Sequence, residues 1–129
     1  MLNDPLSNAL SVILNAEKIG KESCIIKPTS KIIEKLLEIL NREGFLGSFE
    51  KIKAYGGNQL KMNLIGQINK CGAIKPRYAI QFLEIEKFEK RFLPAKDFGV
   101  LIISTSQGIM TNNEAKKKRI GGKLIAYCY

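Results

Sequence analysis

The stretch VLIISTSQGIMTNNEAKKKRIGGKLIAYCY, residues 100–129, decides the fold of the second half of the chain. Its first four residues, 100–103, are all apolar and predict a buried strand. A Thr-x-x-Glu capping box at residues 111–114 predicts a short helix that continues to Arg119. A glycine pair at residues 121–122 ends that helix, and the apolar run after it predicts a final strand. The predicted order is therefore strand, polar loop, helix, strand.

Before this stretch, the signals are shorter. Residues 78–82 predict a strand, and residues 88–92 predict a helical turn ended by Pro94, because the residue before a proline disfavours helix. The Lys-Pro-Arg segment at residues 75–77 opens this section, so a boundary between two lobes is expected at residues 72–76.

The first half of the chain predicts two helices and a small sheet. Asp4 followed by Pro5 is a strong helix start, and this helix should end before Gly20. A second helix follows the cap residues 29–30 and carries a wide apolar stripe as far as Gly44. The predicted strands are residues 23–27, 45–55, 60–65 and 67–71, with a hairpin turn at residues 56–58.

These elements together predict an α+β protein of two lobes. Residues 1–72 should form an N-terminal α/β lobe with two helices on a small sheet. Residues 73–129 should form a C-terminal, mostly antiparallel β lobe with one short helix.

The charge of the chain indicates a polyanionic partner. There are 21 basic and 12 acidic residues, giving a net charge of +9, and the excess is concentrated after residue 72. Nucleic acid and an anionic membrane face both suit such a protein. The apolar runs are far shorter than the roughly 20 residues that cross a bilayer, and the first residues do not resemble a secretion signal. The expectation is a cytoplasmic protein without a membrane partner.

The chain lacks histidine, which lowers the case for an enzyme because Ser-His and Cys-His nucleophile pairs are excluded. Its three cysteines are far apart and form no Cys-x-x-Cys pair, so neither a metal site nor a cofactor is predicted. They are expected to be small buried side chains.

The polar loop at residues 104–108 is the most distinctive candidate site. Hydroxyl and amide groups can bond phosphates, ribose 2′-hydroxyls and base edges, and glycine permits close approach. An ordinary polar connection is the alternative. Beyond the loop, the candidates carry hydroxyl or cationic groups near a helix start, a proline or the basic run at residues 116–119. From these groups, the residues predicted to contact RNA are Ser104, Thr105, Ser106, Gln107, Gly108, Ser30, Lys31, Lys75, Arg77 and Lys116.

The stretch STSQGIMTNNEAKKKRIGGKLIAYCY, residues 104–129, resembles the C-terminal signature of the small-subunit ribosomal protein S8 family. The segments DPLSNALSVILNA and PTSK also fit that family. Bacterial members usually have Glu after the glycine pair, where this chain has Lys123. Together with RFLPAKDFG at residues 91–99, Lys123 is similar to the archaeal and eukaryotic branch.

The resemblance implies a structural protein that binds the central domain of small-subunit ribosomal RNA early, at an irregular helix, and has ribosomal proteins as neighbours. It implies that Ser104, Thr105 and Ser106 contact the distorted core of that helix and that Gly108 permits close approach. Ser30 and Lys31 would hold the RNA backbone. The resemblance also implies RNA contacts by Thr111, within the matched signature, and by Lys123, whose ammonium would bind a phosphate.

Two other functions remain open from the sequence. The first is a translational regulator that binds its own messenger RNA outside the ribosome. The second is a small hydrolase with Ser104 or Ser106 as nucleophile and a lysine base, although no nucleophile elbow is present.

Overall fold

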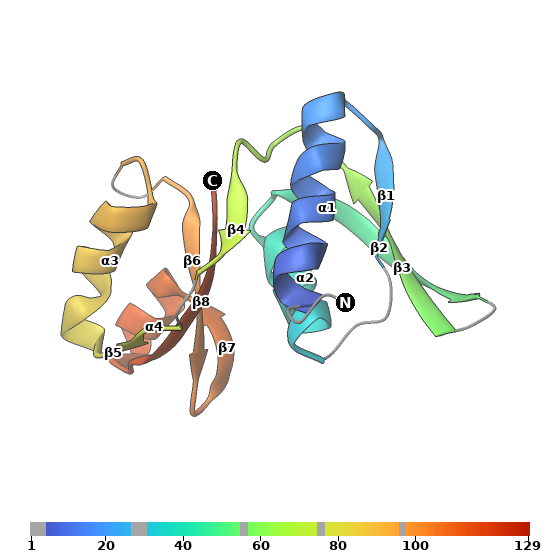
Figure 1. Ribbon diagram of the computed structural model, residues 1–129. Helices are drawn as coiled ribbons and strands as arrows, with labels where there is room; N and C mark the ends of the chain where they lie inside the picture. Colours follow the sequence, from blue (N-terminus) through green and yellow to red (C-terminus); the bar gives the residue numbers. More distant parts are fainter. Residues whose placement is uncertain (1–4, 27–30, 55–56, 75–76, 96–97) are drawn as a thin grey trace. The chain divides into compact units, whose positions relative to one another are not determined.

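The computed structural model describes residues 5–26, 31–54, 57–74, 77–95 and 98–129 (Figure 1). The chain divides into two compact units, residues 1–69 and residues 70–129. Each unit has its own antiparallel sheet, which confirms the predicted α+β class.

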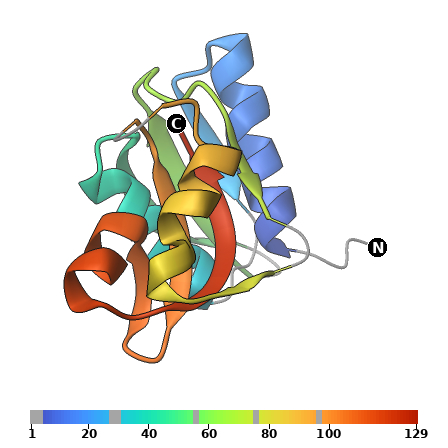
Figure 2. The same cartoon turned by 90° about the vertical axis from the view of Figure 1, so that its left-hand side faces the viewer.

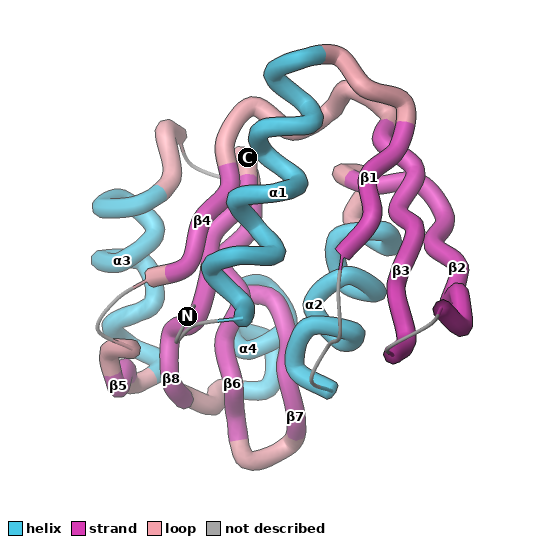
Figure 3. The backbone as a smooth tube through the Cα atoms, turned by 45° about the vertical axis from the view of Figure 1, so that its right-hand side comes forward, coloured by secondary structure: helices cyan, strands magenta, loops and turns pink. Residues whose placement is uncertain are grey.

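The first unit packs two helices on a three-stranded sheet of order β1-β3-β2. Figure 3 shows both helices on one side of these strands. The apolar stripe of the second helix places Ile33, Leu36, Leu37 and Leu40 in the core, each at most 1% exposed. The elements are α1 (Pro5–Ile19), β1 (Ser23–Ile26), α2 (Lys31–Arg42), β2 (Leu46–Ala54) and β3 (Gly57–Leu64).

Both helix ends in this unit follow the sequence signals. Gly20 and Gly44 have φ angles of +83° and +85°, a conformation that glycine adopts without the steric penalty of a Cβ. Asp4 and the cap residues 29–30 lie outside the described residues. The turn predicted at residues 56–58 lies too late in the sequence, because Gly57 already pairs with Ala54 in the ladder.

The second unit contains a sheet of order β4-β8-β6-β7, with the two-residue strand β5 also on β8. Figure 2 shows α3 and α4 over the same side of this sheet. Their apolar residues form one core with Leu101, Ile103, Met110 and Leu124 of the strands. The elements are β4 (Cys71–Ala73), β5 (Ala79–Ile80), η1 (Phe82–Glu84), α3 (Ile85–Phe92), β6 (Val100–Thr105), β7 (Gly108–Thr111), α4 (Asn112–Lys118) and β8 (Gly122–Cys128).

Several predicted elements of this half are wrong in detail. The strand expected at residues 67–71 is instead β4, which begins at Cys71 and pairs with β8. Strand β4 belongs to the second unit, which begins at Lys70. The strand expected at residues 78–82 shortens to Ala79–Ile80 before a 3-10 turn.

The second unit also has more helix than the single short one expected. Helix α3 spans Ile85–Phe92, longer than the turn predicted at residues 88–92. It begins earlier because Ile85 and Phe88, three positions apart, lie on one buried face of the helix. Leu93 is extended, as expected before Pro94.

Candidate nucleic-acid interface

The predicted polar loop is a tight hairpin turn, which we call the β6–β7 turn (residues 104–108). Thr105 pairs with Gly108 across the hairpin, so only Ser106 and Gln107 lie between the strands. Figure 3 shows this turn at the tip of β6 and β7. The sequence prediction of a loop running directly into a helix is wrong, because the residues after it form strand β7.

Thr105 holds the backbone of the turn. Its Oγ1 donates a hydrogen bond to the Gly108 carbonyl oxygen at 2.7 Å. The same Oγ1 accepts one from the Gln107 backbone N–H at 3.1 Å. A hydroxyl with both its donor and an acceptor site engaged has little capacity left for a ligand. Thr105 therefore shapes the turn from within.

The other polar side chains of the turn face solvent. Ser104, Ser106 and Gln107 are all exposed. Gly108 is exposed too, at a φ of +113°, and a Cβ built on it would meet no atom within 4 Å. The turn thus presents two hydroxyls and an amide beside an uncovered stretch of backbone, groups that can bond phosphates and ribose hydroxyls.

Lys123 lies directly opposite Ser104 in the β6–β8 ladder, and both residues are exposed. Opposed residues of an antiparallel pair project from the same face of the sheet, so an ammonium group accompanies the Ser104 hydroxyl. The close approach of β8 to β6 at this point depends on Gly122, where a Cβ would overlap the Ser104 carbonyl oxygen. The close packing of Gly122 on Ser104 therefore determines the position of Lys123.

Thr111 has a structural role. It is 1% exposed, and its Oγ1 accepts a hydrogen bond from the Glu114 backbone N–H at 3.3 Å. This confirms that Thr111 is the N-cap predicted for α4. Its hydroxyl is thus placed in the protein interior, unlike those of Ser104 and Ser106.

Lys116 also has a protein partner. It forms an ion pair with Glu89, whose side chain is only 12% exposed. The rest of the basic run, Lys117, Lys118 and Arg119, is exposed. The sequence points to this basic run, but the residue predicted from it, Lys116, is the one that pairs with another side chain of the protein. Helical spacing alone does not show which lysine lies near a carboxylate of another helix.

Glu89 belongs to a polar network that joins α3, α4 and β6. Its Oε1 accepts a hydrogen bond from Asn112 Nδ2 at 2.8 Å. Asn112 is 4% exposed, and its Oδ1 accepts one from the Leu101 backbone N–H at 3.2 Å. Glu89 is therefore bound by two side chains of α4 and is not simply solvated. The network holds α4, and with it the basic run, against the sheet.

The remaining candidates lie elsewhere in the chain. Arg77 is exposed just before Tyr78. Lys31 is the first residue of α2, but its side chain is not among those described. Ser30 and Lys75 lie outside the described residues.

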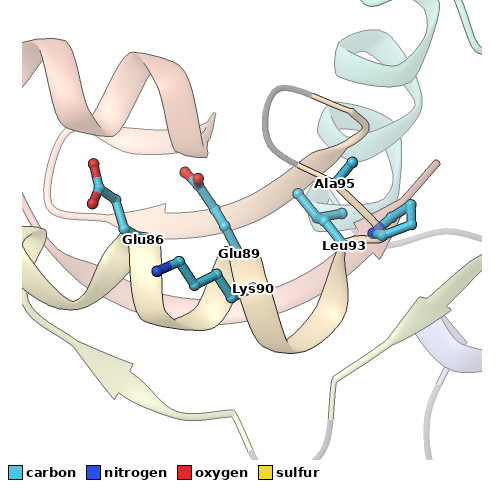
Figure 4. A pocket seen from close by; sticks show the side chains of 6 residues that line it. Glu86, Glu89, Lys90, Leu93 and Ala95 are labelled. Carbon is cyan, nitrogen blue, oxygen red and sulfur yellow. The ribbon is translucent and has the colours of Figure 1, made fainter.

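A hollow of about 400 Å³ lies beside α3. Figure 4 shows Glu86 and Glu89 on one side and the apolar residues Leu93 and Ala95 at the other end. Glu89 accepts a hydrogen bond from Asn112 and forms an ion pair with Lys116. The carboxylates of Glu86 and Glu89 are therefore not an equivalent acid–base pair. This hollow is distinct from the β6–β7 turn.

Other kinds of site receive no support in the described parts of the chain. No cluster of three or more metal-ligating side chains occurs there, and no described helix is long and apolar enough to cross a membrane. Burial raises the pKa of the Cys24 thiol above its ordinary value of 9.0, and the nearby charge of Glu17 raises it further. Cys24 is therefore a protonated, poorly reactive thiol at neutral pH.

Comparison with known protein families adds one finding. A family model described as ribosomal protein S8 matches residues 4–129. The match covers both structural units and contains the β6–β7 turn, Lys123 and the basic run of α4.

Proposed function

Because the chain belongs to the ribosomal protein S8 family, we propose that its β6–β7 turn recognises an irregular helix in the central domain of small-subunit ribosomal RNA and thereby aids assembly of the subunit. Family membership makes the protein a structural, RNA-binding component of the small ribosomal subunit with ribosomal proteins as neighbours. It is not an enzyme.

The observation that supports the proposal is that neighbouring hydroxyls of the turn differ in their hydrogen bonding and in their exposure to solvent. Thr105 is hydrogen-bonded within the turn, whereas Ser104 and Ser106 are presented to solvent. A-form RNA is recognised through its shape, its 2′-hydroxyls and unstacked bases, and rigidly placed groups that both donate and accept hydrogen bonds suit that task. An irregular helix offers such bases, and a regular duplex does not.

The cations near the turn supply a different part of the binding free energy. Lys123 is positioned beside Ser104, and Lys117, Lys118 and Arg119 project from α4 and its end. Lysine and arginine on phosphates contribute attraction that depends on salt and not on sequence. In this proposal the turn provides specificity and the cations provide affinity.

Ser104 and Lys123 could also suggest a serine nucleophile with a lysine base. A lysine serves as a base when it is desolvated, but Lys123 is exposed. The pair is better suited to contact a phosphate and a ribose on one RNA strand.

Three further contacts belong to the proposal. Ser30 and Lys31 would hold RNA backbone from the first unit. Lys31 is the first residue of α2, and a helix N-terminus favours anions. Arg77, exposed before β5, would add a phosphate contact. Assignment to the archaeal and eukaryotic branch stays a prediction based on Lys123 and on RFLPAKDFG at residues 91–99.

Binding to a short RNA fragment tests the function. The affinity of the full chain for a fragment from the central domain of small-subunit ribosomal RNA is compared with that for a regular duplex of equal length, across a salt series. We expect both affinities to fall with salt while a large preference for the fragment persists. Equal binding to both RNAs, disappearing together as salt rises, would contradict specific recognition by the turn.

A further inference from the structure

Two of the three cysteines lie opposite each other on neighbouring strands. Cys71 of β4 pairs in register with Cys128 of β8. Neither is joined in a disulfide in the structure, and both are buried, with exposed fractions of 4% and 1%. They are 57 positions apart in the sequence, so their proximity is a product of the fold.

The backbone hydrogen bonds beside Cys71 and Cys128 show whether the two residues form a hydrogen-bonded or a non-hydrogen-bonded pair of the ladder. Lys70 and Tyr129, one position away, exchange both backbone bonds at 2.8 Å. In an antiparallel ladder hydrogen-bonded and non-hydrogen-bonded pairs alternate, so Cys71 and Cys128 occupy a non-hydrogen-bonded position. The Ile74 N–H bond to the Ile125 carbonyl, at 3.0 Å, fits the same alternation.

That position has the geometry of a cross-strand disulfide. The Cα atoms of such a pair are about 4.5 Å apart with their side chains close together, and disulfides span Cα separations of about 4.4–6.8 Å. We propose that Cys71 and Cys128 form an oxidation site, which closes to an intramolecular disulfide between β4 and β8 when the protein meets a hydroperoxide or a small-molecule disulfide.

The chemistry balances with either oxidant. With hydrogen peroxide, one thiol loses its proton and the thiolate attacks an oxygen; the O–O bond breaks, and the leaving hydroxide takes up the proton, giving a sulfenic acid and one water. The second thiol loses its proton and its thiolate attacks that sulfur; the S–O bond breaks, and the leaving hydroxide takes up this proton as a second water while the disulfide forms. With oxidised glutathione, two successive exchanges transfer two electrons and release two glutathione thiols.

Access to the buried thiols comes from the edge of the sheet. Strand β4 has three residues, and among the described strands it pairs only with β8. Short edge segments open locally with lower free energy than the sheet interior. Brief opening of β4 exposes Cys71 to the oxidant, and closing returns it to Cys128. Oxidation should therefore accelerate in concentrations of urea too low to unfold the protein.

Cys24 is a matched internal control. It belongs to the first unit, is also buried, and has Met62 as its register partner in place of a second cysteine. If oxidation joins Cys71 to Cys128 and leaves Cys24 unchanged, neither burial nor cysteine chemistry alone can account for it.

The test uses the folded full chain, exposed to oxidised glutathione or hydrogen peroxide and then alkylated and mapped by mass spectrometry. We expect a loss of two hydrogen atoms from the intact mass, one alkylatable thiol at Cys24, and a cross-linked peptide joining Cys71 to Cys128. The melting temperature should rise by several degrees, because the bond closes a long loop.

Variants separate this result from misfolding. Cys24→Ser should cross-link as the wild type does, and Cys128→Ser should yield no intramolecular cross-link. Three alkylatable thiols after oxidation would overturn the proposal, as would cross-links to Cys24 or cross-linking only at urea concentrations that unfold the chain. Since the decisive arms are the wild type and Cys24→Ser, the proposal does not depend on Cys128→Ser folding.

Discussion

At the scale of single residues, adjacent hydroxyls of the β6–β7 turn differ in what they do. Thr105 bonds within the turn, and Ser106 faces solvent at its tip. Sequence alone treats both as equivalent hydroxyl groups, because the hydrogen bond from Thr105 to Gly108 exists only once the hairpin has formed. Substitutions at these two positions should therefore give different results.

Ser106→Ala should lower affinity for the ribosomal RNA fragment by about 1–3 kcal/mol, the scale of a buried polar group left without its partner. The melting temperature should hardly change, since the side chain is exposed. Titration of the RNA fragment and a thermal melt measure the two quantities. Thr105→Ala is the control and should weaken both binding and stability. Unchanged RNA affinity in Ser106→Ala would argue against the turn as the recognition site.

Gly122→Ala should destabilise the second unit by about 1–3 kcal/mol, because overpacking forces backbone to shift. The added Cβ would overlap the Ser104 carbonyl oxygen. Urea denaturation measures the destabilisation, with Ser106→Ala as a nearly neutral control in the same unit. A Gly122→Ala protein as stable as the wild type would show that β8 can move away from Ser104 at little cost.

The raised pKa of Cys24 gives a prediction in alkaline solution. A group whose pKa is higher in the folded state than in the unfolded state makes its full contribution to stability below its unfolded pKa. That contribution is lost as the pH rises through the folded pKa. Stability of the wild type should therefore decline more steeply above pH 9.0 than that of Cys24→Ala. Urea denaturation at several pH values compares the slopes. Identical slopes would mean that the thiol titrates alike in both states.

At the scale of elements, the position of α4 depends on one buried amide. Asn112 joins the Leu101 backbone to Glu89, which also pairs with Lys116. Because the network links two helices and a strand, it determines where the exposed Lys117 and Lys118 are presented. Removing the Asn112 side chain should thus affect both stability and RNA binding.

Asn112→Ala should lower the free energy of unfolding by about 1–3 kcal/mol, since it leaves the buried Leu101 N–H and one bond of Glu89 unsatisfied. Asn113→Ala is the matched control, because Asn113 is the exposed next residue of the same helix. Urea denaturation of both variants gives the comparison. Equal destabilisation would indicate that helix propensity, and not the network, sets the stability of α4.

Sequence predicts elements well where their signals are local. The cap at Thr111 and the glycines at 20 and 44 depend on neighbouring residues, and the structure confirms them. Strands β4 and β7 escape sequence reasoning because they have three and four residues and exist by pairing with distant partners. Of the candidate site, the polar turn could be located from sequence, whereas the pairing of Lys116 with Glu89 could not.

At the scale of the whole molecule, charge should govern affinity more than specificity. The net charge of +9 favours any polyanion. Replacing Lys117 and Lys118 together with Gln should weaken binding to the RNA fragment and to a regular duplex alike. It should also reduce the slope of log affinity against log salt by about 1 for each phosphate that the variant no longer neutralises.

The control for that double variant is Lys35→Gln. Lys35 is an exposed lysine of α2 that pairs with Glu38. Titrations at several salt concentrations should show an unchanged slope in this variant. A double variant that loses preference for the fragment while keeping the wild-type slope would assign the two lysines to base recognition.

The pairing of β8 with β4, β5 and β6 has a consequence for synthesis of the chain. All three partners precede it, so their sheet lacks its joining strand until residues 122–128 have emerged from the translating ribosome. The first unit, complete at residue 69, can fold much earlier. A nascent chain stalled before residue 122 should therefore carry a folded first unit and a protease-sensitive second one.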